Sequence, residues 1–394
     1  MAEPPTQVVA VVRHRGGLLV CDDGVGGGPA LPSAPVESAA PEAALEDLLV
    51  RLGVPARAVE RRGEPVAVEG GRYHPFLVTV PERPTTVGDA CLEPRWTAPA
   101  TLRRGPDDPW WRVYRAVAPT VDSVAADRER GSTAIAVDAL WALRDAATAA
   151  EAEGRGLESV ASVARSLVAA RPSMAALATR VDRVMAGATT ADEVAAAADR
   201  GIVEAFAADA TAARLAAETV GDGPVLTLSR SGTVAEALLA ARPTTVVLAS
   251  RPGSEGLAVA DDLVAAGLDV TTAPDAAVYD LLRDGDVAAV LVGADAVTAD
   301  GAVVNKVGTW AAAHAASLAN VPCFVVTGAD KVRAAPDEGS SADRELEPSF
   351  AVEPRFDRTP PGFVTALLTD RGWLEPADVP AVAADHRALT AWRR

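Results

Sequence analysis

Two lysines stand out in a chain that otherwise relies on arginine. The 394 residues include 37 Lys and Arg, and the printed sequence shows lysine only at 306 and 331. Lys306 follows Asn305 in the stretch "LVGADAVTADGAVVNKVGTW" (291–310), which also contains Asp295. Lysine is a compact point charge on a flexible stem, whereas arginine is a wide planar fork. A position that keeps lysine near a carboxylate therefore predicts a site that must fit an ammonium.

Asp295 is the first candidate for a catalytic residue. It closes the almost wholly apolar run "VAAVLVGAD", so its carboxylate should be partly removed from water, with a raised pKa. Such a group suits general acid–base work, in which a proton must be given and taken near neutral pH. The alternative is an aspartate that caps a helix or closes a turn.

Polar residues follow the other apolar runs of the C-terminal half in the same way. Ser229 and Ser231 lie in "SRSGT" (229–233), Arg251 lies in "SRPGSEG" (250–256), and "TGADK" (327–331) ends with the second lysine. Serine donors ahead of a helix and an arginine after a buried strand suit phosphate binding. For Ser231 and Thr233 the alternative is plain helix capping, with Glu236 closing a capping box on Thr233.

The elements that position these residues form three predicted domains. From 222 to 394 short apolar runs alternate with helical segments, which predicts a doubly wound, Rossmann-like parallel sheet that is buried on both faces. Ligands of such sheets lie beyond the carboxyl ends of the strands. From 107 to 221 alanine-rich segments with apolar spacings of three and four predict a helical domain. From 1 to 106 strands surround one early helix, which is an α+β pattern.

The amino-acid composition limits the classes of partner that the chain is expected to bind. A formal net charge of −17, with 54 Asp and Glu, argues against nucleic acid and anionic membranes, which would repel the chain. Scarce lysine and abundant acid also suit adaptation to high salt, so we expect a halophilic protein. The three cysteines lie far apart without metal-ligand spacing, and the N-terminus lacks a signal-like apolar core. We expect a soluble cytoplasmic protein with no metal and no cofactor.

Five ordered motifs carry a family resemblance over residues 110–394. They are "RGSTAIA" (130–136), "ARPSMAAL" (170–177), "SRPGSEG", "GADAVTADGAVVNKVGT" and "FDRTPPGFVTALLTDRG" (356–372). The region resembles the family of the translation initiation factor 2B alpha, beta and delta subunits, ribose-1,5-bisphosphate isomerase and methylthioribose-1-phosphate isomerase. That resemblance implies a helical N-terminal part, a Rossmann-like domain and assembly into a homodimer or higher oligomer.

The resemblance also implies roles for individual residues. The substrate-binding positions of the isomerases fall on Arg130, Gly131, Arg171, Arg251, Asn305 and Lys306, and Asp295 matches their catalytic aspartate. Their catalytic cysteine, in a Thr-His-Cys run, falls on Ser229, with Leu228 at the histidine. A serine hydroxyl is a far poorer acid than a thiol, and no histidine stands nearby in sequence to activate it. The binding positions are therefore kept, whereas half of the catalytic pair is replaced.

The first domain resembles a Nudix hydrolase that has lost its catalytic glutamates. The signature helix reads "EDLLVRLG", which places Val50 and Arg51 on the paired glutamate positions and Ser38 on the upstream one, so that Asp47 is the one carboxylate left that could hold a metal. Magnesium needs several carboxylate oxygens to offset its dehydration. We therefore expect no hydrolase activity and a role in interaction or ligand sensing, and we interpret the remaining acidic cluster as a solvated helix start.

Three functions remain open at this stage. The first is a regulatory or weakly catalytic protein that binds a phosphorylated sugar or nucleotide, with Ser231 among the binding residues. The second is an active aldose–ketose isomerase of a ribose-1-phosphate-type substrate, in which Asp295 moves the proton and Ser229 or a substrate hydroxyl replaces the thiol. The third is a module with an initiation-factor-like protein partner, which rests on family analogy alone.

Overall fold

The computed structural model describes residues 5–22, 28–36, 40–68, 71–84, 87–88, 90–103, 105, 108–127, 130–334 and 355–394. The chain divides into two compact units. Unit 1 comprises Met1–Val124, Asp138–Val163 and Ala188–Val203; unit 2 comprises Ala125–Val137, Ala164–Gly187 and Glu204–Arg394. The helices of the middle region contribute to both units, and the predicted division into three domains stays a prediction.

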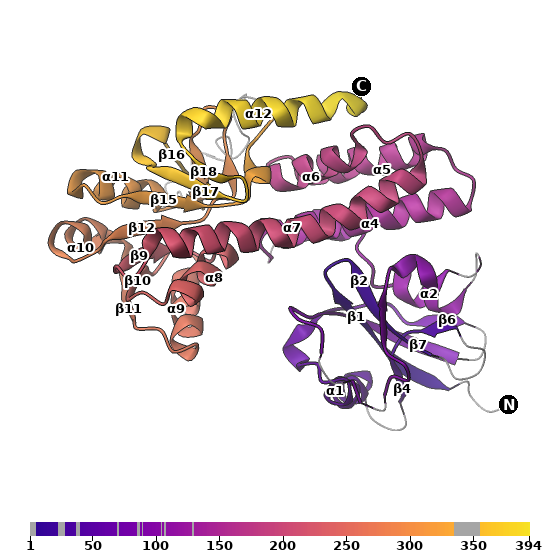
Figure 1. Ribbon diagram of the computed structural model, residues 1–394. Helices are drawn as coiled ribbons and strands as arrows, with labels where there is room; N and C mark the ends of the chain where they lie inside the picture. The colour runs from indigo at the N-terminus through magenta and orange to yellow at the C-terminus, as the bar shows by residue number, and fades with distance from the viewer. Residues whose placement is uncertain are drawn as a thin grey trace, which may run out of the picture. The chain divides into compact units, whose positions relative to one another are not determined.

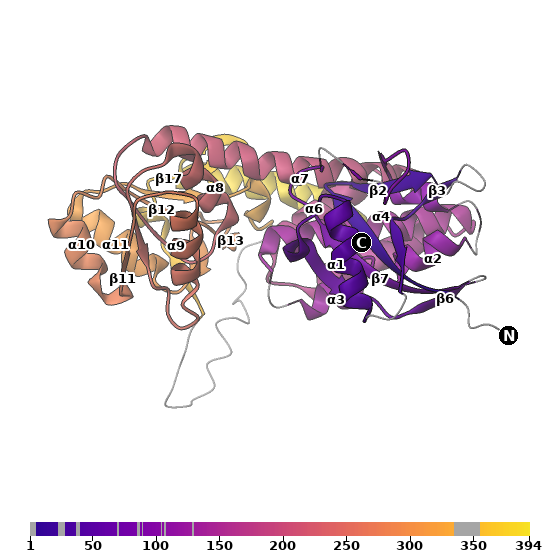
Figure 2. The same cartoon turned by 90° about the horizontal axis from the view of Figure 1, so that it is seen from below.

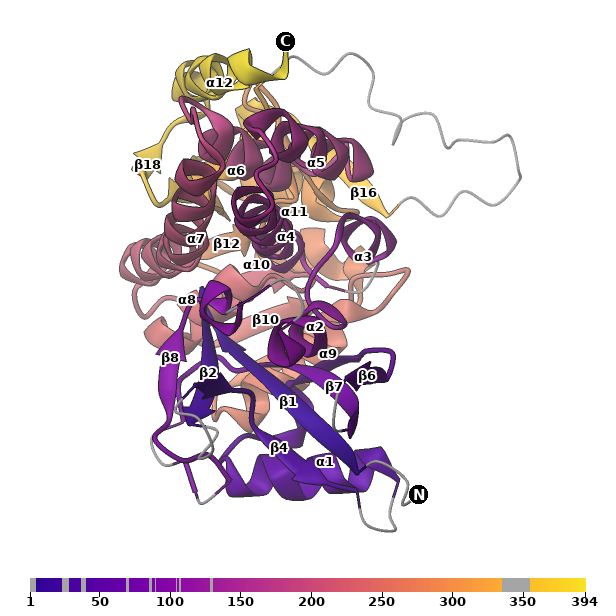
Figure 3. The ribbon, with the colours of Figure 1, turned by 90° about the vertical axis from the view of Figure 1, so that its right-hand side faces the viewer.

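Unit 1 is built on a mixed sheet, drawn in indigo and purple in Figures 1 and 3. Its long strands β1 (Thr6–His14) and β7 (Gly71–Thr79) pair in parallel, and the other strands pair antiparallel. The other strands are β2 (Gly17–Asp22), β3 (Pro29–Ala30), β4 (Ser33–Pro35), β5 (Val59–Arg62), β6 (Val66–Val68) and β8 (Arg95–Thr97). The early helix is α1 (Pro41–Arg51), and α2 (Pro109–Arg115) and α3 (Val121–Ala126) follow the sheet. The expected α+β pattern around one early helix is confirmed for these residues.

Helix α1 packs one face of this sheet through Leu45, Leu48 and Leu49, which are buried with the inward residues of β1 and β7. Val50, at a position expected to match a Nudix glutamate, is 78% exposed on the opposite face. Glu42 at the helix start pairs with Arg62 of β5. Ser38, the upstream position of the expected Nudix signature, lies outside the described residues.

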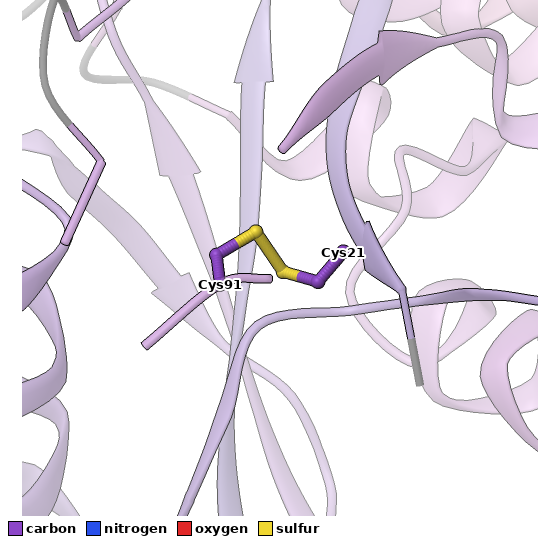
Figure 4. The surroundings of a disulfide bond; sticks show 2 residues. All are labelled: Cys21 and Cys91. Atoms are coloured by element: carbon purple, nitrogen blue, oxygen red, sulfur yellow. A yellow bond between two sulfur atoms is a disulfide. The ribbon is translucent and has the colours of Figure 1, made fainter. Parts of the chain in front are cut away.

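A disulfide joins Cys21 at the end of β2 to Cys91, with 5.0 Å between the Cα atoms (Figure 4). No cysteine pairing is predicted from the sequence, so this bond is a finding of the structure. The separation of 70 residues between the two cysteines gave no sign of the pairing, since the fold alone brings the two side chains together. Cys323, in unit 2, is free and buried, and burial raises the pKa of its thiol to about 12.

A buried ion network ties the other face of the sheet to helix α4 (Ser132–Ala152). The guanidinium of Arg13 on β1 donates to Asp138 at 2.6 Å and to Glu60 at 2.8 Å, and Arg61 also reaches Asp138. Trp141 lies between two cations, with Arg13 5.3 Å and Arg144 4.0 Å from its ring centre. Because Asp138 is 1% exposed, its charge depends on these partners.

Unit 2 contains the predicted doubly wound sheet. In the described residues it has seven strands in the order β11-β10-β9-β12-β15-β17-β18, all parallel except for the last pair. They are β9 (Val225–Leu228), β10 (Thr245–Leu248), β11 (Val270–Ala273), β12 (Ala289–Val292), β15 (Cys323–Val326), β17 (Ala366–Thr369) and β18 (Gly372–Leu374). The chain order reverses between β9 and β12, which makes the gap between their ends the expected ligand position.

Helices cover both faces of this sheet (Figures 1 and 2). Buried alanine, leucine and valine side chains of α10 (Val278–Asp284), α11 (Thr309–Ala319) and α12 (Val379–Ala388) pack one face. The other face packs α7 (Ala191–Val220), α8 (Gly232–Ala241) and α9 (Glu255–Ala265). Helices α5 (Leu157–Ala170) and α6 (Ala175–Met185) precede the sheet. None of the helices in the described part of the chain is both long and apolar enough to cross a bilayer.

A small antiparallel sheet, absent from the sequence prediction, carries the Asn-Lys pair. It consists of β13 (Ala296–Val297), β14 (Val303–Lys306) and β16 (Phe356–Thr359). The turn between β13 and β14 contains Asp300-Gly301, with Gly301 at φ +86°. An Asp-Gly pair between apolar residues is a hairpin signal, so this sheet was open to prediction.

We predict that Asp138→Asn lowers the free energy of unfolding by about 3 kcal/mol, because it leaves the buried guanidinium of Arg13 short of an anion. Urea denaturation followed by circular dichroism measures the change. The matched control is Glu218→Gln, since Glu218 pairs with Arg214 on the surface of α7 at 2.7 Å, with side chains 65% and 60% exposed. That variant should cost less than about 0.5 kcal/mol. Equal effects of the two substitutions would contradict the importance of the buried network.

Candidate functional site

The ends of β9 and β12 form the centre of the candidate site. The register pairs Leu226 with Val290, so the two strands end side by side and the segments that begin at Ser229 and Gly293 leave the sheet together. A Cβ on Gly293 would lie 2.7 Å from Ser231 Oγ. Glycine therefore leaves room for that hydroxyl at the reversal point of the sheet.

The loops that follow β9 and β10 are bonded to one another. Ser229 has φ +67° and donates its N–H to Ser250 Oγ at 2.7 Å. The N–H groups of Ser250 and Arg251 donate to the carboxylate of Asp275, at 2.7 and 2.8 Å. Arg251 itself is exposed, so the loop fixes its backbone while its side chain reaches toward solvent. Left-handed conformations at Ser229, Ser250 and Ser254 are unfavourable for side chains with a Cβ and are typical of functional loops.

Ser231, rather than Thr233, caps helix α8. The Ser231 hydroxyl accepts from the N–H of Val234 at 3.4 Å, and the helix begins at Gly232. The predicted capping box on Thr233 is therefore wrong. Thr233 lies within the first turn and is buried, and Glu236 stands too far along the helix to bond its cap.

Asp295 lies three residues beyond β12, at the edge of the buried interior. It is half-buried, and its N–H donates to the carbonyl of Val304 at 2.9 Å, which closes the β13–β14 hairpin. Burial raises the pKa of its carboxyl, and the positive charge of Lys331 partly offsets that rise. The predicted direction of the shift is confirmed. Because a strand follows Asp295 rather than a helix, the helix-capping alternative is wrong.

Lys306 is buried on β14 and held by a carboxylate that the sequence analysis missed. Its Nζ lies 2.9 Å from Glu255 Oε1, at the start of α9, and its side chain is 7% exposed. Burial opposes ionisation of Glu255, but the hydrogen bond and charge of Lys306, a backbone N–H and the charge of Arg355 together outweigh it, so the pKa of this carboxyl is lowered. The neighbouring Asn305 donates to Thr309 Oγ1 at 3.0 Å. The available signal for Glu255 was its place in "SRPGSEG", directly after a strand end.

Lys331, the second lysine, is buried behind Asp295. Its Nζ donates to the carbonyl of Ala294 at 2.6 Å, and the residue is 9% exposed. Burial lowers the pKa of this ammonium, while the charges of Asp209 and Asp295 raise it and that of Arg180 lowers it further. Both lysines of the chain thus lie on the carboxyl side of the parallel sheet.

Arg130 and Arg171 are brought together by Asp127. Arg130 Nε donates to the Asp127 carboxylate at 2.7 Å, and Arg171 donates to the Asp127 carbonyl. Gly131 follows at the start of α4, where a Cβ would meet nothing within 4 Å. This pair of guanidinium groups at a helix N-terminus is suited to an anion.

A chain of contacts within unit 2 connects these arginines with the strand ends. Arg180 of α6 donates to the carbonyl of Thr133 in the first turn of α4, at 3.5 Å, and to Asp330 at 3.0 Å. Asp330 directly precedes Lys331, which holds the carbonyl next to Asp295. These contacts connect the start of α4, next to Gly131, with the peptide that precedes Asp295.

The N-terminus of α11 is already occupied by a side-chain anion. Asp357 of β16 accepts from the N–H groups of Gly308 at 2.8 Å and Trp310 at 3.1 Å. Burial raises the pKa of this carboxyl, although the two N–H groups lower it in part. The N–H groups of Gly308 and Trp310 are thus already bonded to a carboxylate. Neither Asp357 nor this arrangement was foreseen from the sequence.

The relatives of the chain decide its family. The model of the initiation factor 2 subunit family matches residues 128–376. The chain belongs to this family. A ribose 1,5-bisphosphate isomerase of Haloferax volcanii is 31% identical over 298 residues, covering 68% of this chain and 91% of that protein. A methylthioribose-1-phosphate isomerase of Exiguobacterium sibiricum is 27% identical over 322 residues, covering 71% and 91%.

Solved structures of the family share the fold. The translation initiation factor eIF-2B of Pyrococcus horikoshii OT3 matches with a TM-score of 0.56 and 24% identity, covering 66% of this chain and 97% of that one. The 5-methylthioribose 1-phosphate isomerase of the same organism matches with a TM-score of 0.51 and 22% identity, covering 68% and 86%. The mixed α/β architecture expected from the sequence is confirmed by these matches.

We predict that Asp295→Asn stabilises the protein near neutral pH. Because folding raises the pKa of this carboxyl, the folded chain holds the proton more tightly, so the group favours folding at low pH and opposes it as the pH rises above its ordinary pKa. The free energy of unfolding should rise by about 1 kcal/mol around pH 7, and the gain should vanish below about pH 3. Thermal unfolding across this range, with the exposed Asp261→Asn as control, measures the effect; destabilisation at neutral pH would contradict it.

Proposed function

We propose that unit 2 binds a phosphorylated sugar of the ribose-1-phosphate type, or a nucleotide, and that it is regulatory or weakly catalytic. The observation that carries this proposal is the buried ammonium of Lys306, which pairs with the partly exposed Glu255 on the same side of the sheet as the half-buried Asp295. A buried ammonium is costly to maintain, and it supports a site where polar ligand groups bind. The names of the relatives supply the ligand class.

In this proposal, different binding residues contact different groups of the ligand. Arg130, Gly131 and Arg171 take a phosphate group, since two guanidinium groups converge beside a helix N-terminus. Asn305 and Lys306 meet the oxygens of the sugar. Ser231 and the exposed Arg251 contribute from the β9 and β10 loops.

Ser229 limits turnover. Asp295, with its raised pKa, is suited to give and take a proton. Its partner in the isomerases is a thiol, and a serine hydroxyl releases its proton far less readily near neutral pH. Ser229 directly follows β9 with a left-handed backbone, which supports a role for it as the second group of the site. An unaided serine therefore supports binding more than catalysis.

An active aldose–ketose isomerase is the second candidate, and the raised pKa of Asp295 favours it. A protein-interaction module with an initiation-factor-like partner rests on the family alone.

We also propose that the chain forms a homodimer or higher oligomer. For the first domain, we propose a Nudix-like fold without hydrolase activity, since Val50 and Arg51 occupy the glutamate positions. We further propose that the protein is cytoplasmic and, on its net charge of −17, adapted to high salt.

We predict that Ser229→Cys raises isomerisation of ribose 1,5-bisphosphate by about tenfold or more, because a thiol supplies the missing acid–base group. Phosphorus and carbon NMR follow the ketose over time in the wild type and the variant. Ser229→Ala is the matched control and should show no gain. Rapid turnover by the wild type that Asp295→Asn abolishes would establish the second candidate instead.

A thermal-shift series with the same ligand separates binding from turnover. A ligand present at 100 times its Kd stabilises the folded state by about 2.7 kcal/mol. Stabilisation without product supports the regulatory proposal. Absence of both stabilisation and product for ribose 1,5-bisphosphate, methylthioribose 1-phosphate and nucleotides would overturn it.

A further inference from the structure

Asp209, in the middle of α7, has a carboxylate that the site described so far does not use. Its Oδ1 is buried and has no hydrogen-bond partner among the residues that the structure describes. A carboxylate oxygen removed from water without a donor is unfavourable unless a nearby positive charge compensates it. A nearby cation is therefore needed to stabilise the buried carboxylate of Asp209.

The carboxylate of Asp209 lies against the turn that carries Lys331. A Cβ on Gly328 would stand 3.7 Å from Asp209 Oδ1. The N–H of Lys331 donates to the carbonyl of the same glycine at 3.0 Å, which forms the short helix η4 (Ala329–Lys331). The missing side chain of Gly328 thus leaves the space between α7 and this turn open to the Asp209 carboxylate.

Three charged groups shift the pKa of the buried Lys331 ammonium. The charges of Asp209 on α7 and of Asp295 after β12 raise it, and that of Arg180 on α6 lowers it. The adjacent Asp330 is held by Arg180 at 3.0 Å and by Arg183 at 2.6 Å, so its charge is largely neutralised. Asp209 and Asp295 are therefore the anions that balance Lys331.

We infer that Asp209 is a positioning residue of the site, which holds the Lys331 ammonium against the carbonyl of Ala294 and so fixes the peptide that carries Asp295. Lys331 donates to that carbonyl at 2.6 Å, and an ammonium grips a carbonyl more firmly than a neutral amine does. With Asp209 removed, burial and Arg180 would act against the charge of Lys331 with only Asp295 to oppose them. Asp209 thus acts on Asp295 through Lys331.

The scarcity of lysine makes a direct experiment available. Lysine labelled with ¹³C at Cε gives two side-chain signals in this chain, one from Lys306 and one from Lys331. Lys306→Arg identifies the remaining signal as that of Lys331. The chemical shift followed against pH then reports protonation of Lys331 in the full-length protein without any ligand. The result does not depend on the proposed function, since it requires neither binding nor turnover.

We predict that Asp209→Asn moves the Lys331 midpoint to lower pH, and that Asp295→Asn moves it in the same direction. The matched control is Asp370→Asn: Asp370 Oδ1 would lie 3.9 Å from the same Cβ of Gly328 but accepts the N–H of Ala329 at 2.7 Å. That variant should leave the midpoint in place, because an asparagine oxygen still accepts this hydrogen bond.

A Lys331 midpoint that is the same in Asp209→Asn and in the wild type would overturn the inference. If the asparagine variant does not fold, as judged by far-UV circular dichroism, Asp209→Ser provides the same test with a smaller side chain. A wild-type midpoint at or above the ordinary lysine value would also overturn the arrangement, because burial would then not be acting on the ammonium.

Discussion

The burial of two ammonium groups is the constraint on which the candidate site depends. Lys306 is 6% exposed and Lys331 is 9% exposed, and each reaches across the site to an acceptor from another element. A buried charge is tolerated only when partners compensate its lost hydration. Glu255 does this for Lys306, while Asp209, Asp295 and the carbonyl of Ala294 do it for Lys331. The loops at the strand ends are thereby fixed by electrostatics as well as by the sheet.

The sheet supplies the common origin of these loops. Parallel strands buried on both faces place all their carboxyl ends along one edge, so residues far apart in sequence emerge near each other. The order reversal between β9 and β12 opens the edge at Ser229 and Gly293. The small sheet of β13, β14 and β16 then brings Asn305 and Lys306 back from the loop after β12. A rigid scaffold thus carries a site whose residues lie in the loops at the strand ends, on β14 and at the start of α9.

The parallel sheet and the position of Asp295 at a strand end could be predicted from local sequence pattern. Apolar runs predicted the strands β9, β10, β11, β12 and β15, and the end of one such run predicted the raised pKa of Asp295. Other features depend on contacts between distant residues. Glu255 lies 51 positions from Lys306, and Cys21 lies 70 positions from Cys91, so no local pattern announces either pair. The cap on α8 was misplaced because Ser231 and Thr233 have equal local preference for it, and the tertiary position of the helix start decides between them.

Isothermal titration calorimetry with ribose 1,5-bisphosphate tests the central claim most directly, since it measures binding whether or not turnover occurs. Lys306→Met removes the buried ammonium while keeping an unbranched side chain, and Arg214→Met removes an exposed cation of α7 as a control. The account predicts binding at one site per chain, retained in Arg214→Met and weakened at least tenfold in Lys306→Met, or about 1.4 kcal/mol. Equal affinity of the wild type and Lys306→Met, or no heat of binding in the wild type, would contradict it.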